Sequence, residues 1–252
     1  MLHYQISGNG KENIVLLHGF MENLFVWEYL EEYLSSDFRI IKIDLPGHGQ
    51  SKIYDEVHTM EFMAEKVKEV TDALHLTDFH ILGHSMGGYV SLAFAEHFPE
   101  KLKSLTLFFS SYYADNEEKK DQRRRSFRII KENFKTYVNA GVPNFFNPFE
   151  REKLADEIQL TKEIALSTDN NGALSAVKGM LTRTDKLELI KKLDKKILVI
   201  CGRHDKAVNS YIILKNLPVQ ENIKSYLIDC GHNGHFEKPS ICASIINTEL
   251  IP

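Results

Sequence analysis

The sequence predicts an α/β fold in which helices cover both faces of a mostly parallel sheet and a helical segment is inserted late in the chain. Three observations support this. The chain has 252 residues, 43% of them hydrophobic, which is enough for one large globular core. Short apolar runs alternate with longer segments of helical period up to residue 111. This rhythm breaks over residues 112–191 and resumes at residue 196.

The apolar runs are predicted to be buried strands, because each is short and bounded by turn residues. They are residues 13–18 (NIVLLH), 39–44 (RIIKID), 79–83 (FHILG), 102–109 (LKSLTLFF), 196–201 (KILVIC) and 223–229 (IKSYLID). Residues 24–34, 60–74, 86–97 and 240–250 carry apolar side chains at helical spacing. We expect these segments to be helices that cover the sheet, and sheets covered on both faces are mostly parallel.

Residues 112–191 contain no strand-like run and are rich in charge. Their helical periodicity is interrupted at Pro143, at Pro148 and over residues 169–172. We interpret them as a helical cap inserted between two parts of the core, residues 1–111 and 192–252. Because the cap leaves after one strand and returns before another, it can cover the carboxyl ends of the strands, where open α/β sheets bind ligands.

Charge and cysteine content disfavour several classes of function. With 31 basic and 35 acidic residues, the net charge of −4 creates no field that would gather nucleic acid or an anionic membrane. Cys201, Cys230 and Cys242 are too few for a disulfide framework or a zinc site, which fits a reducing compartment. The first ten residues lack the features of a leader, and no apolar run approaches the roughly 18 residues of a membrane span. We therefore expect a cytoplasmic protein that binds neither nucleic acid nor membrane.

The strongest chemical motif is G-x-S-x-G at residues 83–87 (GHSMG), directly after one predicted strand and before a predicted helix. A serine held at a strained strand-to-helix corner needs very small neighbours, and Gly83, Gly87 and Gly88 supply them. Such a corner exposes the hydroxyl and directs the backbone N–H of Met86 toward a developing oxyanion. Ser85 is therefore the predicted nucleophile.

A serine hydroxyl needs a base to take its proton, and the base needs an acid to fix its tautomer. His232 follows the strand at 223–229, and Asp205 follows the strand at 196–201. The order Ser, Asp, His along the chain fits a known arrangement of this triad. His235 competes as the base. Asp229 competes as the acid, although it lies inside a predicted strand, and the loop after residue 109 offers only serines.

Other residues have a structural and a functional interpretation. His18 and His48 have no carboxylate at ligand spacing, so we expect hydrogen bonding within turns and predict no metal site. Trp27, Tyr112, Phe145 and Phe146 could line an apolar acyl pocket or simply pack the cap on the core.

A basic run in the cap could hold an anionic substrate group or an acidic carrier protein, or could be a solvated helix face. It consists of Lys119, Lys120, Arg123, Arg124, Arg125 and Arg128.

Several motifs together resemble the α/β-hydrolase family, particularly its cap-bearing serine esterase and haloperoxidase-like branch. They are residues 18–20 (HGF), 44–51 (DLPGHGQS), 83–88 (GHSMGG), 202–205 (GRHD) and 231–232 (GH), with Glu237 and Pro239 following. The resemblance covers nearly the whole chain outside the cap. It implies the α/β-hydrolase fold, a second oxyanion donor at the backbone N–H of Phe20, and a structural turn at residues 44–51.

The predicted function is hydrolysis of a small carboxylic ester through an acyl-enzyme on Ser85, which requires no cofactor. Carbon–carbon bond hydrolases use the same triad, although their branch usually has a tryptophan where this chain has Asn233. A carrier-protein methyl-ester esterase is a third possibility. Dehalogenases and epoxide hydrolases of this fold carry an aspartate at the elbow, which disfavours both. A non-catalytic sensor of a small molecule is the alternative from another class.

Overall fold

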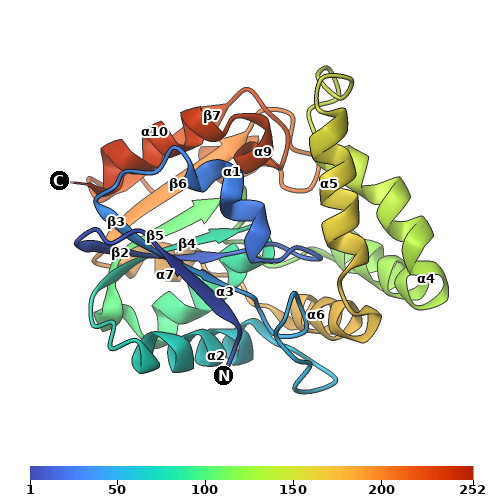
Figure 1. Ribbon diagram of the computed structural model, residues 1–252, viewed down its shortest axis with the longest axis horizontal. Coiled ribbons are helices and arrows are strands. Elements are labelled where there is room, and N and C mark those ends of the chain that lie inside the picture. Colours follow the sequence, from blue (N-terminus) through green and yellow to red (C-terminus); the bar gives the residue numbers. More distant parts are fainter. Residues whose placement is uncertain (252) are drawn as a thin grey trace.

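A seven-stranded sheet forms the centre of the molecule in the computed structural model, which describes residues 1–251 (Figure 1). The spatial order of the strands is β1-β3-β2-β4-β5-β6-β7. Strand β1 pairs with β3 antiparallel, and every other pair is parallel. The strands are β1 (Tyr4–Ser7), β2 (Glu12–Leu17), β3 (Phe38–Ile43), β4 (Phe79–His84), β5 (Leu102–Phe108), β6 (Lys196–Gly202) and β7 (Ile223–Ile228).

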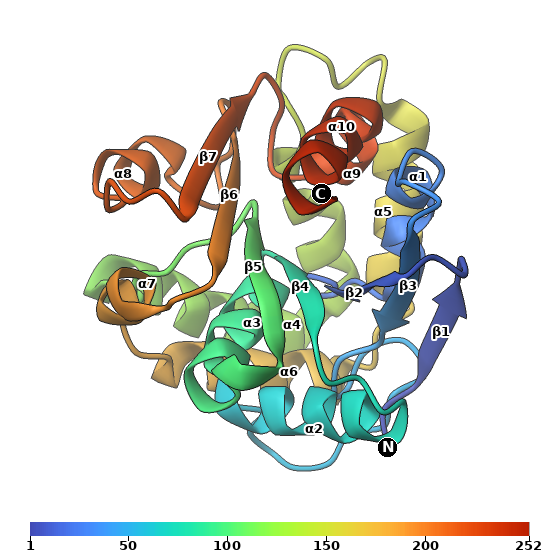
Figure 2. The same ribbon diagram turned by 90° about the vertical axis from the view of Figure 1, so that its left-hand side faces the viewer.

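Helices cover both faces of this sheet, as Figures 1 and 2 show. Helices α1 (Glu28–Glu31) and α10 (Pro239–Leu250) lie on one face, and α2 (Met60–Ala73) and α3 (Met86–His97) lie on the other. The shorter core elements are η1 (Leu24–Trp27), η2 (Pro99–Lys101), α8 (Ser210–Lys215) and α9 (Gly234–Glu237). The apolar side chains of the central strands are fully buried between the two helical layers, which explains their unbroken hydrophobic runs.

The segment between β5 and β6 contains no strand, in agreement with the charge-rich helical pattern of the sequence. It holds α4 (Glu117–Gly141), η3 (Val142–Phe145), α5 (Ala155–Leu166), α6 (Asn170–Thr182) and α7 (Leu187–Lys192). Helix α4 contacts η3, α5 and α6, and we call these four elements the cap. Figure 1 shows the cap beside one end of the sheet. Within α4 the backbone leaves helical geometry at Asn133, whose side chain then accepts the backbone N–H of Thr136.

The six predicted strands and the alternation of strands with helices are confirmed, and two differences from the prediction have local causes. Strand β1 was not predicted because its four residues are mostly half-buried and carry no apolar run. The helix expected over residues 24–34 is instead a 3-10 turn followed by one α-helical turn. Asn23 caps the backbone N–H of Phe25, two residues on, which starts the tighter turn.

Within residues 1–251, no helix combines the length and the apolar character that crossing a bilayer requires.

Candidate active site

Ser85 sits at the corner between β4 and α3 in a backbone conformation that side chains other than glycine rarely adopt, with φ 49° and ψ −113°. Its N–H donates to the carbonyl of Phe108 on the neighbouring strand at 3.1 Å, which holds the corner in place. The flanking glycines are required sterically. A Cβ on Gly83 would lie 2.2 Å from the carbonyl oxygen of Gly87, and one on Gly87 would lie 2.2 Å from that of Leu17. The corner therefore stores strain, as predicted for a nucleophile elbow.

His232 and Asp205 form a buried pair in the loops after β7 and β6. The Nδ1 atom of His232 is 2.7 Å from Oδ2 of Asp205, whose side chain is fully buried. The other carboxylate oxygen, Oδ1, accepts the backbone N–H groups of Ala207 at 2.7 Å and Val208 at 2.9 Å. Asp205 is therefore fixed by three hydrogen bonds. Within residues 1–251 Nε2 of His232 makes no hydrogen bond, so it is available to accept a proton.

The competing residues lie in other environments. Asp229 has a side chain that is 74% exposed and pairs with His204 rather than with His232. His235 is fully buried, and among residues 1–251 neither of its ring nitrogens has a hydrogen-bond partner. Burial holds the pKa of His235 well below its ordinary value, so this imidazole is neutral.

Two backbone N–H groups are available to hold an oxyanion. Met86 is the first residue of α3, and Phe20 lies in the turn after β2. Within residues 1–251 neither N–H group is used in a hydrogen bond. Both Phe20 and Ser85 line one cavity, where such donors could act.

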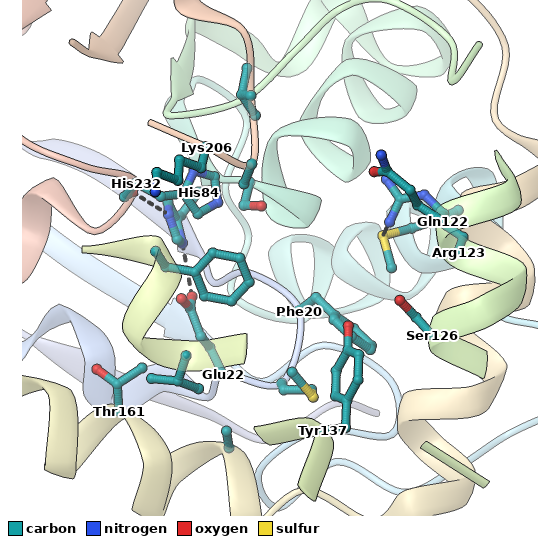
Figure 3. A pocket seen from close by; sticks show the side chains of 18 of the residues that line it. Phe20, Glu22, His84, Gln122, Arg123, Ser126, Tyr137, Thr161, Lys206 and His232 are labelled. Atoms are coloured by element: carbon teal, nitrogen blue, oxygen red, sulfur yellow. Dashed lines mark hydrogen bonds and ion pairs between the residues drawn. The ribbon is translucent and has the colours of Figure 1, made fainter. Parts of the chain in front are cut away.

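A second carboxylate–histidine pair, Glu22 and His84, lies beside the first and was not predicted from the sequence. Oε2 of Glu22 is 2.9 Å from Nδ1 of His84 and accepts the N–H of Gly19 at 2.6 Å. Nε2 of His84 is in turn 3.1 Å from the carbonyl oxygen of His232 (Figure 3). One buried carboxylate thus connects the Phe20 turn, the Ser85 corner and the loop of His232.

Glu22 and His84 each shift the pKa of the other toward its charged form. Burial alone would lower the pKa of His84, but the facing carboxylate of Glu22 outweighs burial and raises it. Burial would likewise raise the pKa of Glu22, and the charge and hydrogen bond of His84 lower it well below its usual range.

Donor atoms of Glu22, His84 and His235 lie within 4.8 Å of one another, which is close enough to share a metal ion. However, Glu22 and His84 already satisfy each other, and the second nitrogen of His84 faces a carbonyl oxygen. The hydrogen bonds therefore fit a positioning network better than a set of metal ligands. No sequence motif indicates Glu22, because its role depends on a contact with a residue 62 positions away.

The loop of His232 is also bonded to the cap. The backbone N–H of His232 donates to the carbonyl of Phe145 at 2.7 Å. The carboxylate of Glu237 accepts the N–H of Gly231 in the core and that of Asn147 after η3. Burial raises the pKa of Glu237. Movement of η3 and of the residues that follow it would therefore shift His232 directly.

Ser85 and His232 line a common cavity of about 210 Å³ between the sheet and the cap. Figure 3 shows His232 and several other residues that line this cavity. Of the four aromatic residues expected to line it, Phe145 does. The other three do not, because they are fully buried in packing contacts. Trp27 packs against His84 and Phe108, Phe146 packs against Phe236, and the Tyr112 hydroxyl donates to a carbonyl on α8.

His18 and His48 make turn hydrogen bonds rather than a ligand set. Nε2 of His18 accepts the N–H of Leu45 at 2.9 Å, and Nδ1 of His48 is 3.1 Å from the carbonyl oxygen of Pro46.

Comparison with known proteins gives a family and several relatives. A family model described as the alpha/beta hydrolase fold matches residues 12–239. A Bacillus subtilis protein with the provisional name 2-succinyl-6-hydroxy-2,4-cyclohexadiene-1-carboxylate synthase is 26% identical, over 96% of this chain and 91% of its own length. A Pseudomonas putida 2-hydroxy-6-oxononadienedioate/2-hydroxy-6-oxononatrienedioate hydrolase is 35% identical over 42% of this chain and 39% of its own length. A thermophilic esterase from Thermogutta terrifontis, solved with malate bound, superposes with a TM-score of 0.93 at 28% identity, over 99% of this chain and 92% of that one.

Proposed function

Because this chain belongs to the α/β-hydrolase family, we propose that it is a serine hydrolase that cleaves a small carboxylic ester with Ser85, His232 and Asp205. The observation that carries the proposal is the Asp205–His232 hydrogen bond of 2.7 Å, next to a strained serine that faces the same cavity. Esterase activity in the Thermogutta relative supports it.

In the first half of the reaction, the Ser85 oxygen attacks the acyl carbon while Nε2 of His232 takes its proton. The imidazolium is stabilised by Asp205, whose other carboxylate oxygen accepts two backbone N–H groups. In the resting arrangement the Ser85 hydroxyl has no hydrogen bond among residues 1–251, so its side chain must turn toward Nε2 as substrate binds.

The negative charge that forms on the acyl oxygen is held by the free N–H groups of Phe20 and Met86, the latter at the positive end of α3. The intermediate collapses when His232 returns the proton to the departing alcohol. Water, deprotonated by the same histidine, then attacks the acyl-Ser85 ester, and His232 returns this proton to the Ser85 oxygen as the acid leaves. Apart from the ester and water, every group in this cycle belongs to the chain.

Carbon–carbon bond hydrolysis is the second candidate, favoured by the Pseudomonas relative that hydrolyses an oxononadienedioate. The same nucleophile, base and oxyanion donors would serve that reaction. Asn233, fully buried after His232 where that branch usually has a tryptophan, is the sequence feature that disfavours it.

The test is a substrate panel assayed on wild type and Ser85→Ala. It contains p-nitrophenyl esters of increasing acyl length, a carrier-bound methyl ester and a dienone acid. We expect wild type to turn over the short p-nitrophenyl esters fastest and Ser85→Ala to lose at least about a thousandfold in kcat. Full esterase activity in Ser85→Ala would refute the proposal, and turnover of the dienone acid alone would establish the second candidate.

A further inference from the structure

The basic run at the start of α4 divides into two faces. Lys120 and Arg124 point outward and pair with Glu117 and Asp121 on the same helix. Lys119 and Arg123, four residues apart, lie about 100° around the helix from these two and line the catalytic cavity. Lys206, from the loop after Asp205, lines the same cavity (Figure 3). We refer to Lys119, Arg123 and Lys206 as the cationic group.

The charges that face this cavity do not balance. The cationic group contributes three positive charges, and Glu22 is the only carboxylate that lines the cavity among residues 1–251. That carboxylate is already paired with His84. Two further buried carboxylates lie nearby. Asp115 is held between Arg123 and Arg183, so it neutralises only one of these two arginines. Asp205 attracts Lys119 electrostatically, but its oxygens are hydrogen-bonded to His232 and to two backbone N–H groups. The cavity therefore carries excess positive charge, with Lys119 and Arg123 half-buried and Lys206 exposed at its edge.

The cationic group also has unused hydrogen-bond donors. Nη1 of Arg123 contacts only the sulfur of Met180, a weak acceptor, at 3.2 Å. Nζ of Lys119 donates to the carbonyl of Ala207 at 3.0 Å and has no carboxylate partner within residues 1–251. Burial and the neighbouring Arg123 lower the pKa of Lys119, as expected for an ammonium beside another cation. Lys206 makes no hydrogen bond or ion pair in that part of the chain.

A second pocket of about 480 Å³ adjoins the cavity and shares Tyr89, Lys119, Gln122 and Lys206 with it. The two lysines therefore stand where the catalytic cavity opens into this pocket. The pocket also holds Asp115 and Glu118, of which Asp115 is the carboxylate already paired with arginines. A substrate acylating Ser85 could extend toward this opening and place its far end between the lysines.

We propose that the cationic group is a carboxylate subsite, and that the preferred substrate is an ester carrying a free carboxylate on the part remote from the scissile bond. The three donors match a carboxylate, whose two oxygens accept about four hydrogen bonds. Charge-assisted bonds in an enclosed site are strong enough to determine specificity. An acidic protein partner fits less well, because these cations face the cavity and not the outer surface of α4. The inference rests on the proposed ester hydrolysis.

The experiment compares each ester with a neutral isostere of the same length. Monoethyl succinate, adipate and suberate are assayed beside the corresponding ethyl esters in which a primary amide replaces the free carboxylate. At the best chain length, we expect kcat/KM for the acid ester to exceed that for the amide ester by at least about tenfold. This acid-to-amide ratio should fall toward one in Lys119→Met and in the Lys119→Met, Lys206→Met double variant. Arg128→Met, on the exposed side of α4, is the matched control and should keep the ratio of wild type.

A second measurement uses only wild type, in case the cap variants do not fold. Adipate should inhibit hydrolysis of a neutral p-nitrophenyl ester competitively, and adipamide should do so at least about tenfold more weakly. An acid-to-amide ratio near one in wild type, with both esters hydrolysed only when Ser85 is present, would overturn the subsite and leave ester hydrolysis standing. Turnover that survives in Ser85→Ala would overturn the proposed function itself.

Discussion

At the scale of single residues, the placement of the proposed triad could be predicted because each member follows a recognisable strand, and parallel strands bring their carboxyl ends to one edge. Ser85, Asp205 and His232 are such residues, and the hydrogen bond between the last two has the geometry this chemistry needs. Glu22 could not be predicted in this way, since its partners Gly19 and His84 meet it only in the folded chain. The cationic group was seen only in part, as one interpretation of a basic run.

Asp205→Asn tests the tautomer of the base. The asparagine oxygen can keep the N–H groups of Ala207 and Val208, but its amide would face Nδ1 of His232 as a donor. Nε2 would then carry the proton and could not accept one from Ser85. We expect kcat to fall by about a hundredfold to ten-thousandfold, measured with a short p-nitrophenyl ester. Asp229→Asn, the exposed alternative, should behave as wild type, and the reverse result would assign the acid to Asp229.

Glu22→Gln tests the positioning network. Glutamine keeps the shape of the side chain but carries no charge. Its amide oxygen would therefore accept the N–H groups of Gly19 and of protonated His84 less strongly than the carboxylate oxygen does. Because the oxyanion turn and the base would both shift slightly, kcat should fall by about tenfold to a hundredfold while KM changes little. Glu28→Gln, on the exposed side of α1, is the control. A rise in KM at constant kcat would show instead that Glu22 only contacts substrate.

At the scale of elements, the buried strands were predictable from their unbroken apolar runs, and the long helices were predictable from apolar residues at helical spacing. The edge strand β1 and the 3-10 turn η1 were not predictable. The strand has three half-buried residues and one exposed residue and therefore no apolar run, and the turn depends on a single side-chain cap. The helical nature of residues 112–191 was predictable from charge and period. Which of its basic side chains face inward was not, because that depends on how α4 docks over the cavity.

Gly87→Ala tests the close approach of α3 to β2 at the elbow. Its Cβ would lie 2.2 Å from the carbonyl oxygen of Leu17, so the helix or strand must move. We expect the free energy of unfolding, measured with urea, to fall by about 2–3 kcal/mol. Gly141→Ala is the matched control, because that glycine has helical geometry and open space around it. It should gain about 0.5–1 kcal/mol. Equal stability of the two variants would contradict the packing at the elbow.

At the scale of the whole molecule, buried histidines make stability depend on pH. Burial lowers the pKa of His18, of His235 and, to about 3, of His48. Below about pH 6.5 the unfolded chain takes up protons that the folded chain does not, so stability must fall as pH falls. For three fully neutral histidines the slope approaches about 4 kcal/mol per pH unit. The raised pKa of His84 stabilises the folded state. This contribution is fully present below the pKa that His84 has in the unfolded chain, and it is lost as the pH rises through the folded pKa. It therefore does not offset the loss of stability at low pH.

Urea unfolding between pH 7.5 and 5 measures this slope. His48→Asn should flatten it, because asparagine can still donate to the carbonyl of Pro46 and does not titrate. His75→Asn is the control and should leave the slope unchanged, because His75 is exposed and not buried. Its φ of 55° is a conformation that asparagine tolerates, so the substitution should not disturb the fold. Stability that is constant or rises as the pH falls from 7 to 5 would contradict neutral burial of these histidines.

The central claim is that Ser85 is a nucleophile activated by His232. The most direct measurement is intact-protein and peptide mass spectrometry after treatment with a fluorophosphonate, in parallel with loss of esterase activity. We expect one adduct per chain, on Ser85, formed at the rate at which activity disappears, much slower in His232→Ala and absent in Ser85→Ala. Complete inactivation with the adduct on another residue, or undiminished labelling of Ser85 in His232→Ala, would contradict it.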